Sequence, residues 1–209
     1  MAIGRFATTF LLALWMMGAL ASDAVAGTPT EADRFIDGIG HKVLDLLSRY
    51  QESPGPTYRD ELKRIVHDNF DLEWTTRFVI GRHWREATPQ QQAELLTLMP
   101  EYAAEIAARA VFAVKATDIN SFRVLDSQPL DGKDGLVTTE VKVKAEPFMV
   151  GWRVRDEGRG LRIVDAMIRG VSMALTLRQT FDSVIEREGL NGLIADVRGK
   201  LTEMRSAAR

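Results

Sequence analysis

The chain has 209 residues, of which 45% are hydrophobic, and a formal net charge of −2. A chain of this length and composition can bury one sizeable core, and it lacks the surplus of positive charge with which nucleic-acid-binding proteins neutralise phosphates. It contains no cysteine, which excludes disulfides, cysteine-based zinc sites, thiol nucleophiles and iron–sulfur clusters. We therefore expect no nucleic-acid partner and a fold that rests on its own hydrophobic core.

The first residues have the pattern of a signal peptide. Arg5 precedes an uncharged apolar run over residues 6–21, and Ala24-Val25-Ala26 supplies small residues where a signal peptidase cleaves. The alternative is a retained membrane anchor, but the run is shorter than the roughly 20 residues that cross a membrane as a helix. The sequence predicts a cleavable signal peptide over residues 1–26, export to the periplasm, and one water-soluble domain over residues 27–209.

The first half of the mature chain has a helical pattern. Thr30 can cap a helix, and Thr88-Pro89 supplies a cap followed by a proline at the first helical position. Gly81 marks the end of the third predicted helix. Apolar residues recur at helical spacing in four segments, over about residues 30–50, 58–66, 70–80 and 88–106.

From Phe122 the apolar period changes to two. Apolar and polar residues alternate over residues 137–145 and 148–154, so each of these predicted strands has one apolar face and one polar face. Residues 161–168 form a further predicted strand. This alternation is typical of an antiparallel sheet that is covered on one side only.

Two amphipathic helices complete the chain, over about residues 173–188 and 193–204, with Asn191 as the expected cap between them. The order of elements predicts an α+β fold. It would consist of a curved antiparallel sheet of about four strands with helices packed on its apolar face.

Few side chains indicate catalysis or metal binding. The histidines His41, His67 and His83 form no pair at metal-ligand spacing. Residues 170–174 resemble the Gly-x-Ser-x-Gly motif of a nucleophile elbow around Ser172, but alanine replaces the second glycine. A helix cap is therefore the better interpretation of Ser172. Asp165 lies in an apolar strand, where it is better explained as a carboxylate held by backbone donors or an arginine than as a general base. We expect no catalytic residue and no metal; the alternative is a small enzyme that uses Asp165 or His83 as a base in an apolar pocket.

Three stretches, taken in order, share their motifs with one known family. Residues 78–92 contain an aromatic-glycine-basic segment that leads into Ala-Thr-Pro-x-Gln. Ile163-Val164-Asp165 is followed by Gly170-Val171-Ser172-Met173, and residues 181–185 by the Gly-Leu-x-x-Leu-Ile of residues 189–194. In these features the chain resembles the MlaC family, the periplasmic, toluene-tolerance-type auxiliary components of lipid ABC transporters. The resemblance extends over essentially the whole mature chain.

The resemblance implies a function and a set of partners. It implies a periplasmic carrier that shuttles phospholipid between the outer and inner membranes, as the soluble component of an MCE/ABC lipid transport system that maintains outer-membrane lipid asymmetry. The implied partners are an inner-membrane ABC transporter with an MCE-domain subunit and an outer-membrane lipoprotein complex. No cofactor is implied, because the bound lipid is cargo. The hopanoid-associated HpnM branch shares this architecture, so a hopanoid carrier is the alternative. Arg169 departs from the family, in which an acidic residue is common at this position.

The resemblance also implies a cavity in which the sheet and helices enclose both acyl chains, with the headgroup near solvent. Apolar periodicity by itself suits a filled core equally well, and a scaffold without a ligand would have such a core. The residues that we predict to bind lipid are bulky and apolar and face the interior at strand or helical spacing: Phe70, Trp74, Phe78, Leu98, Tyr102, Val141, Val143, Val150, Trp152, Met167 and Phe181.

Overall fold

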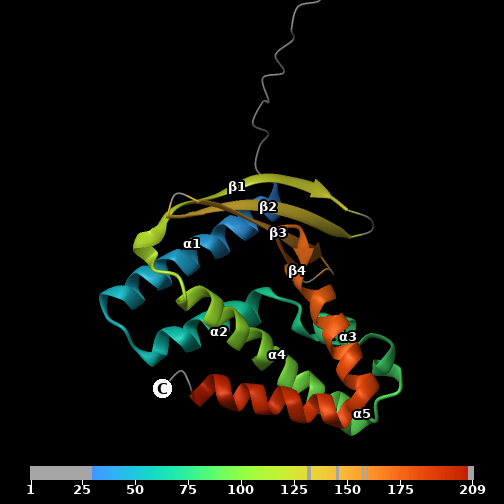
Figure 1. Ribbon diagram of the computed structural model, residues 1–209. Coiled ribbons are helices and arrows are strands. Elements are labelled where there is room, and N and C mark those ends of the chain that lie inside the picture. Colours follow the sequence, from blue (N-terminus) through green and yellow to red (C-terminus); the bar gives the residue numbers. More distant parts are fainter. Residues whose placement is uncertain (1–29, 131–132, 145, 157, 159, 207–209) are drawn as a thin grey trace, which may run out of the picture.

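The computed structural model describes residues 30–130, 133–144, 146–156, 158 and 160–206 (Figure 1). The predicted signal peptide lies outside these residues. Within the described part of the chain, no helix combines the length and apolar character needed to span a membrane.

Helices and strands are grouped along the chain: four α-helices precede the sheet and one long α-helix follows it (Figure 1). The helices are α1 (Glu31–Glu52), α2 (Pro56–Asn69), α3 (Leu72–Ile80), the 3₁₀ helix η1 (Gly81–Arg85), α4 (Pro89–Phe112), the 3₁₀ helix η2 (Ala116–Asp118) and α5 (Met173–Ser206). The strands are β1 (Ile119–Pro129), β2 (Asp134–Val143), β3 (Glu146–Asp156), β4 (Leu161–Ile168) and β5 (Val171–Ser172).

Two helices begin where the sequence predicts because their first turns satisfy their own backbone donors. At the start of α1, the Asp33 N–H donates to Thr30 Oγ1 over 3.1 Å, and the Asp33 carboxylate accepts the Thr30 N–H over 2.7 Å. At the start of α4, Thr88 and Gln91 form the same reciprocal pair, at 3.2 and 2.9 Å. Pro89 occupies the first turn of α4, where its missing N–H costs no hydrogen bond.

The strands form one antiparallel sheet in the order β1-β2-β3-β4-β5. The predicted α+β fold with an antiparallel sheet is confirmed, and the sheet has one strand more than expected, the two-residue β5. The pairing of β3 with β4 shifts register beside Arg153 and Val154, so that these two residues pair with Asp165 and Ile163 and leave Val164 between them. Such a bulge changes which face of the strand the following residues occupy.

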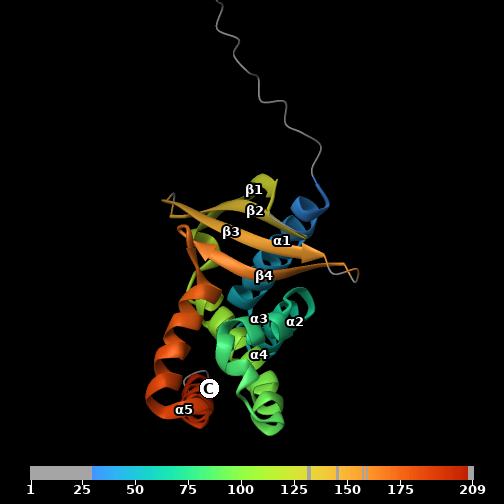
Figure 2. The same cartoon turned by 90° about the vertical axis from the view of Figure 1, so that its right-hand side faces the viewer.

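The sheet forms one layer, and its apolar face is covered first by α1 (Figures 1 and 2). The other long helices lie beyond α1, on the same side of the sheet. Buried side chains gather in separate clusters, one where α3, α4 and α5 pack together around Phe181 and Leu95. Another joins Ile36 of α1 to Val137 and Val154 of the sheet. The helical layer therefore has a core of its own, distinct from the contact between α1 and the sheet.

The C-terminal helix differs from the prediction at its break. Asn191 was expected to cap a second helix, but this prediction was wrong: the helical path of α5 is interrupted at Gly189, with φ 70° and ψ 177°. Glycine adopts a positive φ at a lower conformational free energy than asparagine does. Asn191 instead accepts a hydrogen bond from the Gln91 side chain over 2.8 Å, which joins α5 to the start of α4.

A buried carboxylate holds the helical layer together. Glu105 of α4 is only 1% exposed, and its Oε2 accepts hydrogen bonds from Arg59 Nε and Nη2 of α2 over 3.2 and 2.9 Å. Lys63 forms a further ion pair with it, and Arg205 of α5 lies 3.8 Å from Oε1. Burial by itself would raise the pKa of Glu105, but the hydrogen bonds and charges of Lys63 and Arg59 outweigh it and hold the pKa below its usual value.

Replacing Glu105 by glutamine is expected to lower the free energy of unfolding at pH 7 by about 2–3 kcal/mol. The loss is below that for a fully buried pair because Arg59 and Lys63 keep 22% and 17% of their side-chain surface exposed. Since the pKa is lowered on folding, the stabilisation is present above the ordinary carboxylate pKa of about 4.3 and is lost as the pH falls through the folded value.

The measurement is thermal unfolding of wild type and Glu105→Gln at pH 7 and at pH 3. The difference in Tm should be smaller at pH 3 than at pH 7. As a control, Glu73→Gln removes the exposed pair with Arg77 and should change the free energy by less than about 1 kcal/mol. A difference in Tm for Glu105→Gln that does not depend on pH would contradict the assignment.

Candidate functional site

An apolar cavity of about 310 Å³ lies between the sheet, α1 and the end of α4. Its wall consists of apolar residues and one glycine. They are Ile36, Ile39, Gly40, Val43, Leu44 and Leu47 of α1, Ala110, Val111 and Val114 at the end of α4, and Ile119, Phe122, Val141, Val143, Phe148, Val150, Trp152, Ile163, Ala166 and Ile168 of the sheet. The Trp152 indole N–H is satisfied by Thr139 Oγ1, over 3.0 Å.

The alternation of the strands explains why this wall is apolar. On β2, Val141 and Val143 line the cavity. Lys142 between them and Glu140 before them form an ion pair on the other face, and Glu140 also pairs with Arg123. Neighbouring strands continue the row, because Phe122 pairs with Val141 and Val141 pairs with Phe148. This face of the sheet is thus largely hydrocarbon, and its buried Thr139 is hydrogen-bonded to the Val150 carbonyl.

A glycine lets α1 approach the sheet closely. At Gly40, an added Cβ atom would lie 2.2 Å from Cζ of Phe122 on β1, far inside van der Waals contact. The edge of the Phe122 ring also faces His41, with ring centroids 5.9 Å apart. The helix and strand are therefore in close contact at this point, and Gly40 and Phe122 both line the cavity.

Four of the eleven residues predicted to bind lipid line this cavity: Val141, Val143, Val150 and Trp152. All four lie on the central strands, where period-two alternation determines the face of the sheet directly. That they contact a lipid stays a prediction.

The structure places the other seven predicted residues outside this wall. Leu98, Tyr102, Phe181 and Phe78 belong to the core between α3, α4 and α5. The ring of Trp74 stacks on Phe78 with centroids 5.0 Å apart. Phe70 packs where the α2–α3 connection meets the sheet.

The seventh, Met167, faces away from the cavity because of the β4 bulge. Period-two alternation from Ile163 would place Asp165 and Met167 on the cavity face. With Val164 left between the paired positions, Ala166 and Ile168 line the cavity instead. Met167 packs on the other face, 3.3 Å from the position that a Cβ atom on Gly151 would take.

Sequence reasoning missed the parts of the wall that α1 and α4 supply. The apolar stripe of α1 was visible as Ile39, Val43 and Leu47 at helical spacing, but spacing does not tell which helix covers a sheet. Phe148 could have been found, because it belongs to the same alternation as Val150 and Trp152.

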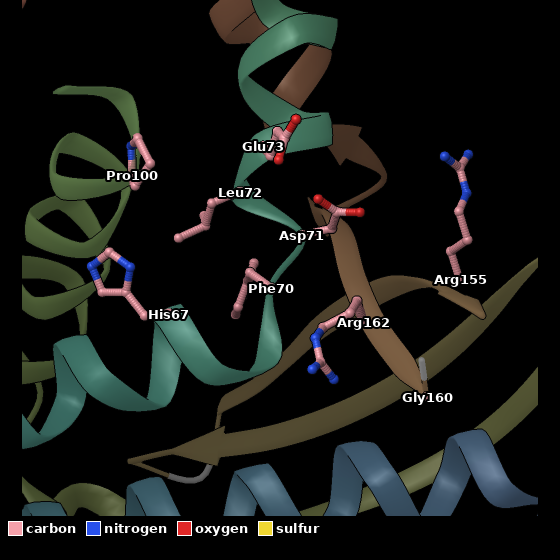
Figure 3. Close-up of a pocket in the computed structure, with 9 residues that line it drawn as sticks. All are labelled: His67, Phe70, Asp71, Leu72, Glu73, Pro100, Arg155, Gly160 and Arg162. Carbon is pink, nitrogen blue, oxygen red and sulfur yellow. The ribbon is translucent and has the colours of Figure 1, made fainter. Parts of the chain in front are cut away.

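A second pocket of about 330 Å³ has a polar wall (Figure 3). Its residues include His67, Asp71, Glu73 and Arg162, and His67 lies 3.3 Å from the Glu101 carboxylate. In Figure 3, Phe70 and Asp71 lie on the connection between α2 and α3, beside β4, and Leu72 begins α3. The Asp71 N–H donates to the Ile163 carbonyl over 2.9 Å. These charged walls do not suit hydrocarbon, and the backbone bond ties the helical layer to β4.

The two candidate bases are both engaged in structural contacts. Asp165 accepts hydrogen bonds from Ser172 Oγ and the Ala174 N–H over 2.5 and 2.9 Å, and Ser172 Oγ accepts the Leu175 N–H over 3.0 Å. Both residues therefore cap the start of α5, as the sequence indicated for Ser172. Neither Asp165 nor His83 belongs to the apolar wall.

His83 joins η1 to α5. It is 8% exposed, and its Nε2 lies 2.8 Å from Asp182 Oδ1 while its Nδ1 lies 3.1 Å from Glu86 Oε2. Both ring nitrogens are thus occupied by carboxylates. Among the residues that the structure describes, no three histidine, aspartate or glutamate side chains are grouped to hold a metal ion.

The antiparallel sheet, the helices on one of its faces and the apolar cavity between them define an α+β fold with room for an apolar ligand. Residues 39–199 match the family described as MlaC protein, and the chain belongs to this family. A solved structure with the same fold is that of the phospholipid-binding protein from Ralstonia solanacearum, determined in complex with a phospholipid. It is 22% identical, with a TM-score of 0.70, over 84% of this chain and 99% of that one.

The close approach at Gly40 generates a stability prediction. Gly40→Ala forces either the Phe122 ring or α1 to move, and overpacking of this kind costs about 1–3 kcal/mol. Gly38→Ala, two residues earlier on α1, has nothing within 4 Å of the new Cβ atom and should stabilise the helix by about 0.5–1 kcal/mol. Urea unfolding of the two variants should therefore shift the midpoint in opposite directions. Equal shifts would show that α1 does not rest on Phe122.

Proposed function

We propose that this protein is a periplasmic carrier that binds one phospholipid by its acyl chains and moves it between the outer and inner membranes. The observation that carries the proposal is the entirely apolar wall of the cavity beneath the sheet. Membership of the MlaC family and the phospholipid bound to the Ralstonia solanacearum protein of the same fold support the cargo.

Hydrophobic free energy explains why a carrier needs such a wall. Two acyl chains contain on the order of 30 methylene groups, and exposing each to water costs roughly 0.8 kcal/mol, or about 24 kcal/mol in total. A lipid does not cross an aqueous compartment alone against that cost. A polar side chain in the wall would lose its hydrogen bonds to water when the chains entered, and the wall offers none to lose.

The wider setting is part of the proposal. Residues 1–26 would be removed on export, leaving residues 27–209 as a single lipid-binding domain. The carrier would receive its lipid from an outer-membrane lipoprotein complex and deliver it to an inner-membrane ABC transporter with an MCE-domain subunit. Catalysis is not part of the proposed function, since Asp165 and His83 are committed to helix capping and to the contact between η1 and α5.

Lipid analysis tests the proposed cargo. Protein purified without detergent from a host that makes both phospholipids and hopanoids should yield about one phospholipid per chain when its organic extract is examined by mass spectrometry. Recovery of a hopanoid instead would assign the other cargo. An extract without lipid would contradict the proposed carrier function.

A cavity-filling substitution tests the site. Ala166→Phe places a ring in the cavity from β4, so the amount of co-purified lipid should fall at least severalfold while the Tm stays within a few degrees, because the ring occupies free volume. Ala195→Phe makes the same change at an exposed position of α5 and should leave the lipid content unchanged. Equal lipid content in both variants would show that the lipid binds elsewhere.

A further inference from the structure

One cation at the edge of the apolar cavity has an unusual backbone. Arg169 follows Ile168, which lines the cavity, and forms the turn between β4 and β5 with Gly170. Its φ is 50°, a left-handed conformation that side chains with a Cβ rarely adopt, and Gly170 follows with φ 80°. Strained backbone of this kind persists where the surroundings impose it, and it gathers at functional sites.

The side chain of Arg169 reaches back to the cavity wall. The centre of its guanidinium lies 5.8 Å from the ring centroid of Phe148, which lines the cavity from β3. This distance is within the range of a cation–π contact. Arg169 itself is exposed and Phe148 is half-buried, so the pair lies where the hydrocarbon wall meets solvent.

The charge of Arg169 is not neutralised within the described part of the chain, where it forms no ion pair. Lys144 provides a contrast at the turn after β2. It also has a left-handed backbone, with φ 51°, but its Nζ lies 3.6 Å from the Asp118 carboxylate and its N–H donates to the Asp118 carbonyl over 2.7 Å. Two cations therefore share the same conformation at the same end of the sheet, and one of them is available for a ligand.

The elements around this end of the sheet add positive charge. Arg109 and Lys115 lie near the end of α4, are exposed, and form no ion pair with other described residues. The Asp118 carboxylate forms an ion pair with Lys144. Glu146, at the start of β3, is an exposed carboxylate near this turn. Of the charged residues named here, three cations (Arg109, Lys115 and Arg169) and one carboxylate (Glu146) form no ion pair with other described residues.

We propose that Arg169 binds the phosphodiester of the lipid headgroup at the mouth of the apolar cavity, held in place by its stacking on Phe148. This inference rests on the proposed function, because it places a phospholipid's acyl chains beneath the sheet. A planar guanidinium matches two phosphate oxygens at once and is weakly hydrated, which suits a site at the boundary between water and hydrocarbon. Arg169 would then select lipids that carry a phosphate over neutral lipids with the same chains.

Matched short-chain lipids test the selection. Delipidated protein is titrated calorimetrically with monomeric dioctanoyl phosphatidylglycerol, with dioctanoylglycerol, which has the same chains without phosphate, and with glycerol 3-phosphate, which has no chains. Wild type should bind the phospholipid about fivefold more tightly than dioctanoylglycerol and should not bind glycerol 3-phosphate at millimolar concentration.

Three variants test whether Arg169 is responsible for the preference for phospholipid. Arg169→Asn keeps a residue type that tolerates left-handed backbone and should abolish the fivefold preference by weakening only the phospholipid. Arg169→Lys should restore part of it. Lys144→Asn is the matched control, with the same backbone conformation and the same loss of charge, and should keep the full preference. Circular dichroism should show the same folded content in all variants.

Each remaining outcome counts against the inference. A preference that survives Arg169→Asn, an equal loss for both lipids, or no preference in wild type would overturn the headgroup contact while the carrier function stands. Binding of glycerol 3-phosphate as tight as that of the phospholipid would assign the site to free phosphate esters. Failure of both lipids to bind would overturn the proposed function together with the inference.

Discussion

The contact between Gly40 of α1 and Phe122 of β1 determines how the rest of the site is arranged. A helix that lies on a sheet normally buries the apolar face beneath it, since hydrocarbon left between layers loses its packing contacts. Here α1 contacts the sheet at Ile36, which packs with Val137 and Val154, and at Gly40, where a side chain larger than hydrogen would collide with the Phe122 ring. The apolar cavity lies between this helix and the face formed by β2, β3 and β4.

A protein can keep such a cavity open only if its stability comes from elsewhere. The helical layer supplies it through the core around Phe181 and the buried carboxylate of Glu105, which joins α2, α4 and α5. The core around Phe181 shares no residue with the cavity wall, so the contacts in that core do not depend directly on what fills the cavity. This separation suits a protein that would exist both with and without its cargo.

Local features of the fold could be predicted from the sequence, because local hydrogen bonds determine them. The caps at Thr30, Thr88 and Ser172 all form as expected. Alternation on β2 and β3 also placed Val141 and Trp152 on the correct face. Two kinds of feature could not be predicted: which helix covers the sheet, which depends on contacts between distant segments, and the β4 bulge, which moved Ala166 to the face expected for Met167.

The hydrogen bonds of Asp165 have a mechanical consequence for the cavity. These hydrogen bonds join Asp165 on β4 to Ser172 and Ala174, on the far side of the turn formed by Arg169 and Gly170. The rim on the β4 side is thereby fixed both to the sheet and to the start of α5. Among the described residues, no side-chain hydrogen bond joins the middle of α1 to the sheet, which it meets there through the Phe122 ring. We therefore expect a bulky ligand to be accommodated by displacement of α1 and not of the β4 rim.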